Sequence, residues 1–189
     1  MRVTAGDLKK GDFLLYQGEI WQVQKAEFSF QGRGMAVVRI KVKAARSGKN
    51  IDITLKSVDA IDLADVATRQ MQYLYNDGSY LHFMDEETYH QVKVAASLVG
   101  DLANFLKPGD KYYVIMHEGE TLNIRPPSSV ALKVVESEDA VKGDTASGAK
   151  KQAKVETGVS VQVPLFIKAG DTIIINPETG EYVERAKNS

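Results

Sequence analysis

Short apolar runs separated by turn signals recur along the 189 residues, and this spacing constrains the fold more than any other feature of the sequence. Residues 13–16 and 20–23 are two such runs, and Gln17-Gly18-Glu19 between them predicts a hairpin. Asn76-Asp77-Gly78 joins two later runs and is a strong hairpin signal. Helical patterns are scarce, and the strand–helix alternation typical of a parallel α/β sheet is missing. The sequence therefore predicts a mainly β protein built from small barrels or sandwiches.

Two breaks divide the chain into thirds. The first follows Asp62-Leu63-Ala64-Asp65, and the second is the proline break Arg125-Pro126-Pro127. Three domains are therefore predicted, at residues 1–65, 66–127 and 128–189. Domains of this size have limited cores, but they are viable when neighbours pack end to end.

The net charge of −1 conceals an uneven distribution. Residues 1–65 carry 11 Lys and Arg against 8 Asp and Glu, a net of +3, whereas residues 66–127 carry 5 against 8 and residues 128–189 carry 8 against 9, nets of −3 and −1. Apolar and basic residues alternate from residue 38 to 43, which predicts a strand with one buried face and one positive face. The positive face consists of Arg39, Lys41 and Lys43, and such a row suits contact with nucleic-acid phosphates.

A single arginine stands between two glycines in the segment Phe28-Ser29-Phe30-Gln31-Gly32-Arg33-Gly34, at the expected apex of a hairpin. Glycine permits tight turns and the close approach of another backbone. With Gly32 and Gly34 on either side, the Arg33 guanidinium is expected to be free to grip phosphate in a bidentate manner or to stack on a base. The local pattern leaves open the alternative of an exposed turn arginine without a function.

Gly-Asp pairs recur along the chain. The pairs that begin at Gly11, Gly109 and Gly170 lead straight into apolar strands and predict structural turns. The pair Gly143-Asp144 is different, because the small and polar residues 143–151 follow no strand pattern. Long loops of this kind inside a β-domain more often carry function.

Several function classes are disfavoured by what the sequence lacks. Because cysteine is absent and His82, His90 and His117 have no metal-ligand spacing, we expect neither a metal site nor a cofactor. No nucleophile elbow or phosphate-binding loop is present, which argues against an enzyme. No apolar run reaches 18 residues and the first residues lack a secretory core, so the sequence predicts a cytoplasmic protein with no membrane association.

The segment 155–167 (VETGVSVQVPLFI), followed by Gly170-Asp171, resembles the signature segment of bacterial elongation factor P. Further segments agree with the same family: residues 143–146 and 179–185 in the last third, 73–78 and 82–84 in the middle third, and the glycine-flanked tip with residues 38–43 in the first third. The likeness spans nearly the whole chain.

The resemblance implies a KOW-like barrel followed by two OB-type barrels in an elongated, L-shaped, tRNA-like arrangement. Such a factor binds ribosomal RNA and proteins between the peptidyl and exit sites, stimulates peptide-bond formation and relieves stalling at consecutive prolines, without bond chemistry of its own. By position, Arg33 would reach the peptidyl-site tRNA, and residues Gly143, Asp144 and Thr145 would approach the messenger RNA in the exit site. Tyr182 and Arg185 would form a C-terminal contact patch, and a monomer is expected.

The tip departs from the family pattern in two ways. Many members carry a β-lysylated lysine where this chain has Arg33, and Gln31 replaces the usual tip proline. In another branch a rhamnosyltransferase modifies an arginine at the tip. Arg33 is therefore expected to be rhamnosylated or unmodified, and an unmodified guanidinium already offers fixed charge and five donors.

Two other interpretations agree less well with the sequence. A paralogue that is similar to elongation factor P also carries arginine at its tip, but residues 143–145 match the main family better. A generic OB-type RNA-binding protein would need stacking aromatic residues on an open basic sheet face, whereas the last two thirds of this chain are acidic.

Overall fold

The computed structural model describes residues 1–30, 34, 36–138 and 148–187. The chain separates into two compact units, one formed by residues 1–69 with 114–123 and the other by residues 70–113 with 124–189. One six-stranded and two five-stranded β-sheets make up most of the described backbone. The prediction of a mainly β protein with three β-domains is therefore confirmed, while the L-shaped arrangement and the domain boundaries stay predictions.

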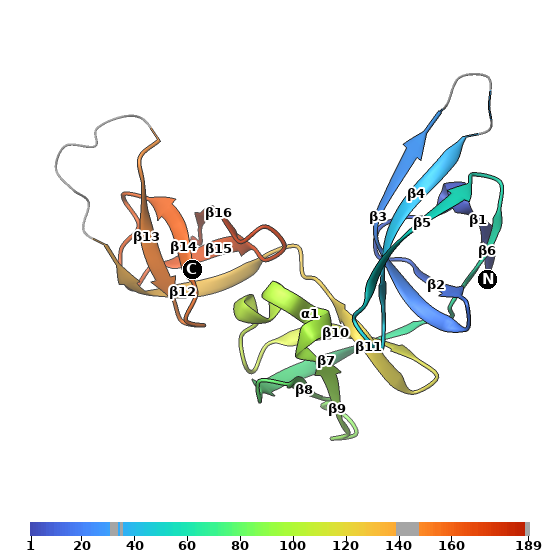
Figure 1. Ribbon diagram of the computed structural model, residues 1–189. Helices are drawn as coiled ribbons and strands as arrows, with labels where there is room; N and C mark the ends of the chain where they lie inside the picture. The colour runs from blue at the N-terminus through green and yellow to red at the C-terminus, as the bar shows by residue number, and fades with distance from the viewer. Residues whose placement is uncertain (31–33, 35, 139–147, 188–189) are drawn as a thin grey trace. The chain divides into compact units, whose positions relative to one another are not determined.

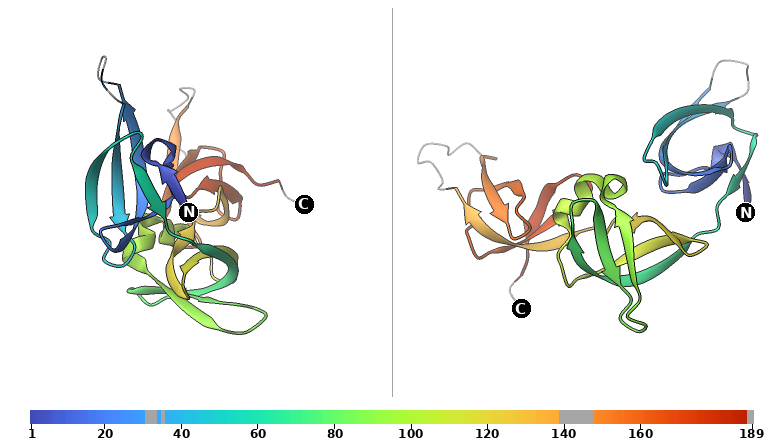
Figure 2. Two further views of the ribbon diagram at one scale, coloured as in Figure 1. Left: turned by 90° about the vertical axis from the view of Figure 1, so that its right-hand side faces the viewer. Right: turned by 60° about the horizontal axis from the view of Figure 1, so that its bottom comes forward.

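The first sheet runs in the order β1-β6-β2-β3-β4-β5 and curls round on itself (Figures 1 and 2). The N–H groups of Ala5 and Gly6 donate to the carbonyls of Asp59 and Ser57, which ties the 3-10 helix η1 (Ala5–Asp7) to the loop after β5. The core contains Trp21, which is buried among aliphatic side chains. The strands of this sheet are β1 (Arg2–Thr4), β2 (Phe13–Tyr16), β3 (Glu19–Ser29), β4 (Val37–Ala44), β5 (Asn50–Lys56) and β6 (Ala60–Leu63).

The second sheet runs in the order β11-β10-β7-β8-β9. Its core holds three aromatic rings: the Tyr73 ring lies 5.3 Å from that of Phe83 and 6.3 Å from that of Tyr112, measured between centroids. Burial raises the pKa of both tyrosine hydroxyls. The elements are β7 (Ala67–Asn76), β8 (Tyr80–Met84), β9 (Gln91–Ala95), α1 (Ala96–Val99), the 3-10 helix η2 (Gly100–Phe105), β10 (Lys111–His117) and β11 (Glu120–Arg125).

The third sheet runs in the order β14-β13-β12-β15-β16 and encloses a core of aliphatic side chains. The Phe105 ring from the end of η2 joins this core. Gly180 lies against that ring with φ +72°, a backbone conformation that favours glycine, and a Cβ at this position would lie 3.3 Å from Phe105 Cζ, a close contact. The strands are β12 (Val130–Ser137), β13 (Lys150–Val155), β14 (Ser160–Pro164), β15 (Thr172–Asn176) and β16 (Glu181–Arg185).

The structural turns predicted at Gly11, Gly109 and Gly170 share one geometry. In each, glycine has a φ between +91° and +96°, and the following aspartate N–H donates to the carbonyl of the lysine two residues before the glycine. The glycine N–H donates to a carbonyl of a neighbouring strand, and Tyr73 accepts the bond from Gly109. The pattern Lys-x-Gly-Asp therefore marks one turn in each third of the chain, and its φ explains why the third residue is glycine.

Helical structure is as sparse as the sequence indicates. The segment from Ala95 to Leu106 contains the four-residue α1 and then η2, and the chain turns at Gly100, the first residue of η2, with φ +66°. None of the helices in the described part of the chain is long and apolar enough to cross a membrane.

Candidate nucleic-acid interface

The basic row lies on the long hairpin formed by β3 and β4. The two strands pair from Trp21 opposite Ala44 out to Ser29 opposite Val37, and the segment between Ser29 and Val37 carries the predicted tip. Val38, Ile40 and Val42 point into the core with at most 1% of their surface exposed. Strict alternation therefore turns Arg39, Lys41 and Lys43 to the opposite face, where Arg39 and Lys41 are exposed and Lys43 is half-buried.

Neighbouring strands add charges that the alternation of β4 alone does not reveal. Lys25 of β3 stands opposite Lys41, and Glu27 stands opposite Arg39. On the other side, β5 places Asp52 opposite Lys41. Two carboxylates, those of Glu27 and Asp52, therefore lie among the cations Lys25, Arg39 and Lys41. The face is less positive than the sequence of β4 alone suggests.

The positive charges dominate locally despite these carboxylates. Lys25 forms an ion pair with Glu27, and the hydrogen bond and charge of Lys25, followed by the charges of Lys41 and Arg39, lower the pKa of the Glu27 carboxyl. A hollow of about 220 Å³ opens over the three strands. It is lined by Lys25, Glu27, Arg39, Ile40, Lys41, Asp52, Ile53 and Thr54. Three cations and two carboxylates line the hollow, so its net positive charge favours an anion such as a phosphate.

The predicted tip lies mostly outside the described residues. Gly32 and Arg33 are among the residues for which the structure makes no statement, whereas Gly34 is exposed. Two aromatic side chains next to the tip were not singled out from the sequence: Phe28 is 51% exposed and Phe30 is 79% exposed. Apolar residues such as these suggest a buried core in the sequence. They are exposed because they lie near the end of the hairpin.

The predicted messenger loop, Gly143, Asp144 and Thr145, also lies outside the described residues. The C-terminal patch lies on β16, where the strand register shifts between Ile174 and Ile175. Tyr182 pairs with Ile175 and Arg185 pairs with Ile173, so the irregularity brings the two side chains to the same face although they are three residues apart.

The two patch residues differ in exposure. Tyr182 is half-buried against the core of the third sheet. The Arg185 guanidinium lies 5.7 Å from the centroid of the exposed Phe166 ring, a cation–π contact. Arg185 therefore offers a positioned cation at the surface, whereas Tyr182 contributes mainly to packing.

The side chains of two of the three histidines, His82 and His117, have structural partners. His117 Nδ1 lies 2.6 Å from the Asp65 carbonyl oxygen, and His82 Nε2 lies 2.8 Å from Asp77 Oδ2. Within residues 1–30, 34, 36–138 and 148–187, no three His, Asp or Glu side chains are arranged to hold a metal ion.

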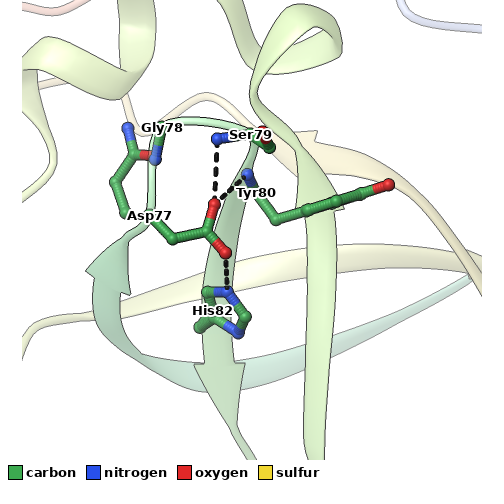
Figure 3. A network of polar contacts seen from close by, with 6 residues as sticks. Asp77, Gly78, Ser79, Tyr80 and His82 are labelled. Atoms are coloured by element: carbon green, nitrogen blue, oxygen red, sulfur yellow. Dashed lines mark hydrogen bonds and ion pairs between the residues drawn. The ribbon is translucent and has the colours of Figure 1, made fainter.

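Asp77 organises the turn between β7 and β8 (Figure 3). Its Oδ1 accepts the backbone N–H groups of Ser79 and Tyr80 at 2.9 and 2.8 Å, and its Oδ2 faces His82. The hydrogen bond with His82, followed by the two backbone N–H groups, lowers the pKa of the Asp77 carboxyl to about 2.

This depressed pKa predicts an acid-sensitive turn. A carboxyl whose pKa is lower in the folded state contributes stability that is complete above the unfolded value near 3.8 and is lost as the pH falls towards 2. A carboxyl-carbon NMR titration should place the Asp77 transition near pH 2, and Asp77→Asn should remove this part of the acid dependence of unfolding. A transition at the ordinary value would contradict the network.

Comparison with known proteins gives the same family for each third of the chain. Family models described as the elongation factor P KOW-like domain, the elongation factor P OB domain and the elongation factor P C-terminal segment match residues 4–61, 66–124 and 130–185. The OB and KOW-like assignments of the first two domains agree with the fold expected from the resemblance.

Individual relatives match over almost their whole length. Elongation factor P of Caldicellulosiruptor saccharolyticus is 42% identical over 183 residues, which cover 97% of this chain and 99% of the relative. The factor of Treponema denticola is 40% identical over 186 residues, covering 98% of this chain and 100% of the relative. Among solved structures, eukaryotic translation initiation factor 5A from Methanococcus jannaschii matches with a TM-score of 0.49 at 19% identity, over 66% of this chain and 92% of that one. Because three family models match its three thirds and relatives about 40% identical align with nearly its whole length, the chain belongs to the elongation factor P family of translation factors.

Proposed function

We propose that the chain binds the ribosome between the peptidyl and exit sites, stimulates peptide-bond formation and relieves stalling at consecutive prolines. The observation that carries the proposal is the match to one translation-factor family in all three thirds of the chain. Membership of this family implies an interaction with the ribosome. The β3–β4 hairpin supports a role for the first domain in contacting RNA, because it exposes Arg39 and Lys41 beside a hollow.

The proposed mechanism is positional rather than chemical. Arg33 belongs to the segment that joins β3 and β4, and it would meet the acceptor end of the peptidyl-site tRNA. Ordering that end restores the reactive geometry that consecutive prolines disturb, and the ribosome then performs the bond formation. The chain needs no cofactor for this role, and we assign it no catalytic residue.

The third domain would provide further contacts. Gly143, Asp144 and Thr145 would approach the messenger RNA in the exit site, and Arg185 would contact the small subunit or tRNA. Such a factor works as one body in the cytoplasm, so we propose a monomer. A rhamnosyltransferase acting on Arg33 is the proposed modifying partner, and intact-mass measurement of the native protein separates a rhamnosylated from an unmodified arginine.

The test is translation of a reporter with consecutive prolines by purified ribosomes. Wild-type protein, isolated from its native host, should restore synthesis of full-length product. Arg33→Ala should reduce this rescue about tenfold or more, because a charge-assisted hydrogen bond contributes about 1.5–3 kcal/mol. A reporter without the proline run should respond to neither protein.

Arg69→Ala is the matched control, since Arg69 is an exposed arginine on β7 that the proposal leaves outside the ribosomal contacts. It should rescue like wild type. Equal rescue by Arg33→Ala and Arg69→Ala would refute the role of the tip. Failure of the native wild-type protein to rescue would refute the proposed function as a whole.

A further inference from the structure

The outer face of the second sheet carries aromatic rings that its core does not use. On β8, Leu81 and Phe83 point inward and are fully buried, which turns Tyr80 and His82 outward. His82 stands opposite Tyr75 of β7 on one side and opposite Lys93 of β9 on the other. Directly opposed residues share a face, so these side chains form one continuous surface. We call Tyr75, Tyr80, His82 and Lys93 the stacking platform.

A strand irregularity creates this platform. Met71 and Tyr73 are buried, and simple alternation would bury Tyr75 with them. The register of β7 shifts between Tyr73 and Tyr75, so that Tyr73 faces the buried Phe83 whereas Tyr75 faces His82. The shift thereby turns the Tyr75 side chain outward, and Tyr75 is 51% exposed. Bulges often redirect a side chain towards a binding surface.

The platform is held rigidly. The Tyr75 and His82 rings are stacked with centroids 4.4 Å apart and planes 16° from parallel. Asp77 anchors the imidazole of His82 from the turn (Figure 3). The His82 side chain is only 19% exposed beneath this stack, so the outer ring is the accessible one. Lys93 Nζ lies 4.3 Å from the centroid of the Tyr80 ring. A flat ring fixed before binding loses little entropy when a second flat group stacks on it.

We propose that the stacking platform binds an unpaired nucleotide of single-stranded RNA, with its base on Tyr75 and its phosphate towards Lys93. Tyr80, His82 and Lys93 lie on the second and third strands of an OB domain, and Tyr75 lies beside the turn between the first two. The face of strands two and three and this turn belong to the region of the fold that binds oligonucleotides. Aromatic rings accept any base, because every base has a π-face. The inference draws on the proposed function only for the source of the RNA, the ribosomal complex.

Charge decides between a single strand and a duplex. Residues 66–127 carry 5 Lys and Arg against 8 Asp and Glu, so this third repels an extended row of phosphates. The platform supplies one cation, Lys93, which matches one phosphate. Binding led by stacking should depend weakly on salt, with a slope of log affinity against log salt of about −0.7 for one phosphate on a single strand.

The test uses the full chain without ribosomes and a short single-stranded RNA that contains one fluorescent 2-aminopurine. Wild type should quench the probe, because the base stacks on tyrosine. Tyr75→Leu keeps an apolar side chain but removes the ring, and should weaken binding about tenfold. Tyr75→Phe should bind like wild type. Tyr89→Leu removes a tyrosine of the same third that is even more exposed, at 73%, and lies outside the platform, and it should have no effect.

Three results would overturn the proposal: no quenching by wild type, equal binding by Tyr75→Leu and wild type, or preference for duplex RNA. Cross-linking of 4-thiouridine RNA to unmodified wild type gives a second readout that needs no substitution, and an adduct on β7–β9 is the expected result. An adduct confined to other strands would also overturn it. These assays contain no ribosome, so a negative result would not bear on the polyproline test of Arg33→Ala. A negative result in the polyproline test would likewise not bear on RNA binding by the platform.

Discussion

Replacing Phe83 by alanine is expected to lower the free energy of unfolding of the second domain by about 3–5 kcal/mol. Phe83 is fully buried on β8, and its ring contacts that of Tyr73. The truncation removes apolar burial and an aromatic pair, and it leaves a cavity that the flanking strands can close only in part. The loss approaches the whole stability of a small domain.

Tyrosine near-ultraviolet circular dichroism during urea unfolding is a suitable measurement, because Tyr73 and Tyr112 belong to the same aromatic cluster. Amide hydrogen exchange on β8 localises the effect to this sheet. Phe30→Ala is the matched control, since Phe30 is 79% exposed and its removal should change stability by about 0.5 kcal/mol or less. Similar losses for both variants would show that Phe83 does not anchor the core.

Ala153→Asp is expected to unfold or nearly unfold the third domain at neutral pH. Ala153 lies on β13 with none of its surface exposed, among aliphatic side chains. Among the residues that the structure describes, no charged or polar residue is buried, so the core offers the new carboxylate no partner. Burying an unpaired charge costs several kcal/mol even after the protein relaxes.

The pH dependence identifies the cause. Burial should raise the pKa of the introduced carboxyl above its unfolded value of about 3.9. The variant should therefore regain stability as the pH falls through the raised pKa towards 4, because the folded state then holds a neutral acid. Denaturant midpoints at several pH values, compared with wild type, measure this recovery. Gln162→Asp places the same group on the exposed side of β14 and should show little loss and little recovery. Equal behaviour of the two variants would disprove the buried-charge explanation.

The local sequence pattern predicted those strands in which the alternation of apolar and polar residues matches the burial in the structure. Residues 38–43 alternate in sequence, and the structure buries Val38, Ile40 and Val42 on one side of β4. The Lys-x-Gly-Asp turns were also predictable, because positive φ at Gly11, Gly109 and Gly170 is a property of the residue itself. The short strands β1 and β6, of three and four residues, have weak patterns and were not predicted individually.

The candidate site was predictable only in part. Arg39, Lys41 and Lys43 follow from the alternation of one strand, but Asp52 opposite Lys41 depends on the pairing between β4 and β5. His82 was expected to be structural, and its contact with Asp77 agrees with that expectation. The stack of Tyr75 on His82 was not expected, because a register shift has no signature in the alternation of apolar residues.

The sequence by itself determined the β-rich class, the turn positions, the positive face of the first third and the family resemblance. These features depend on the chemistry of neighbouring residues, through alternation, glycine conformation and charge. Tertiary structure alone decided which charges meet across strands and which rings leave the core. Lys41 meets Lys25 and Asp52, and Tyr75 turns outward while Tyr73 stays buried, because hydrogen-bond register between strands sets each partner and each face.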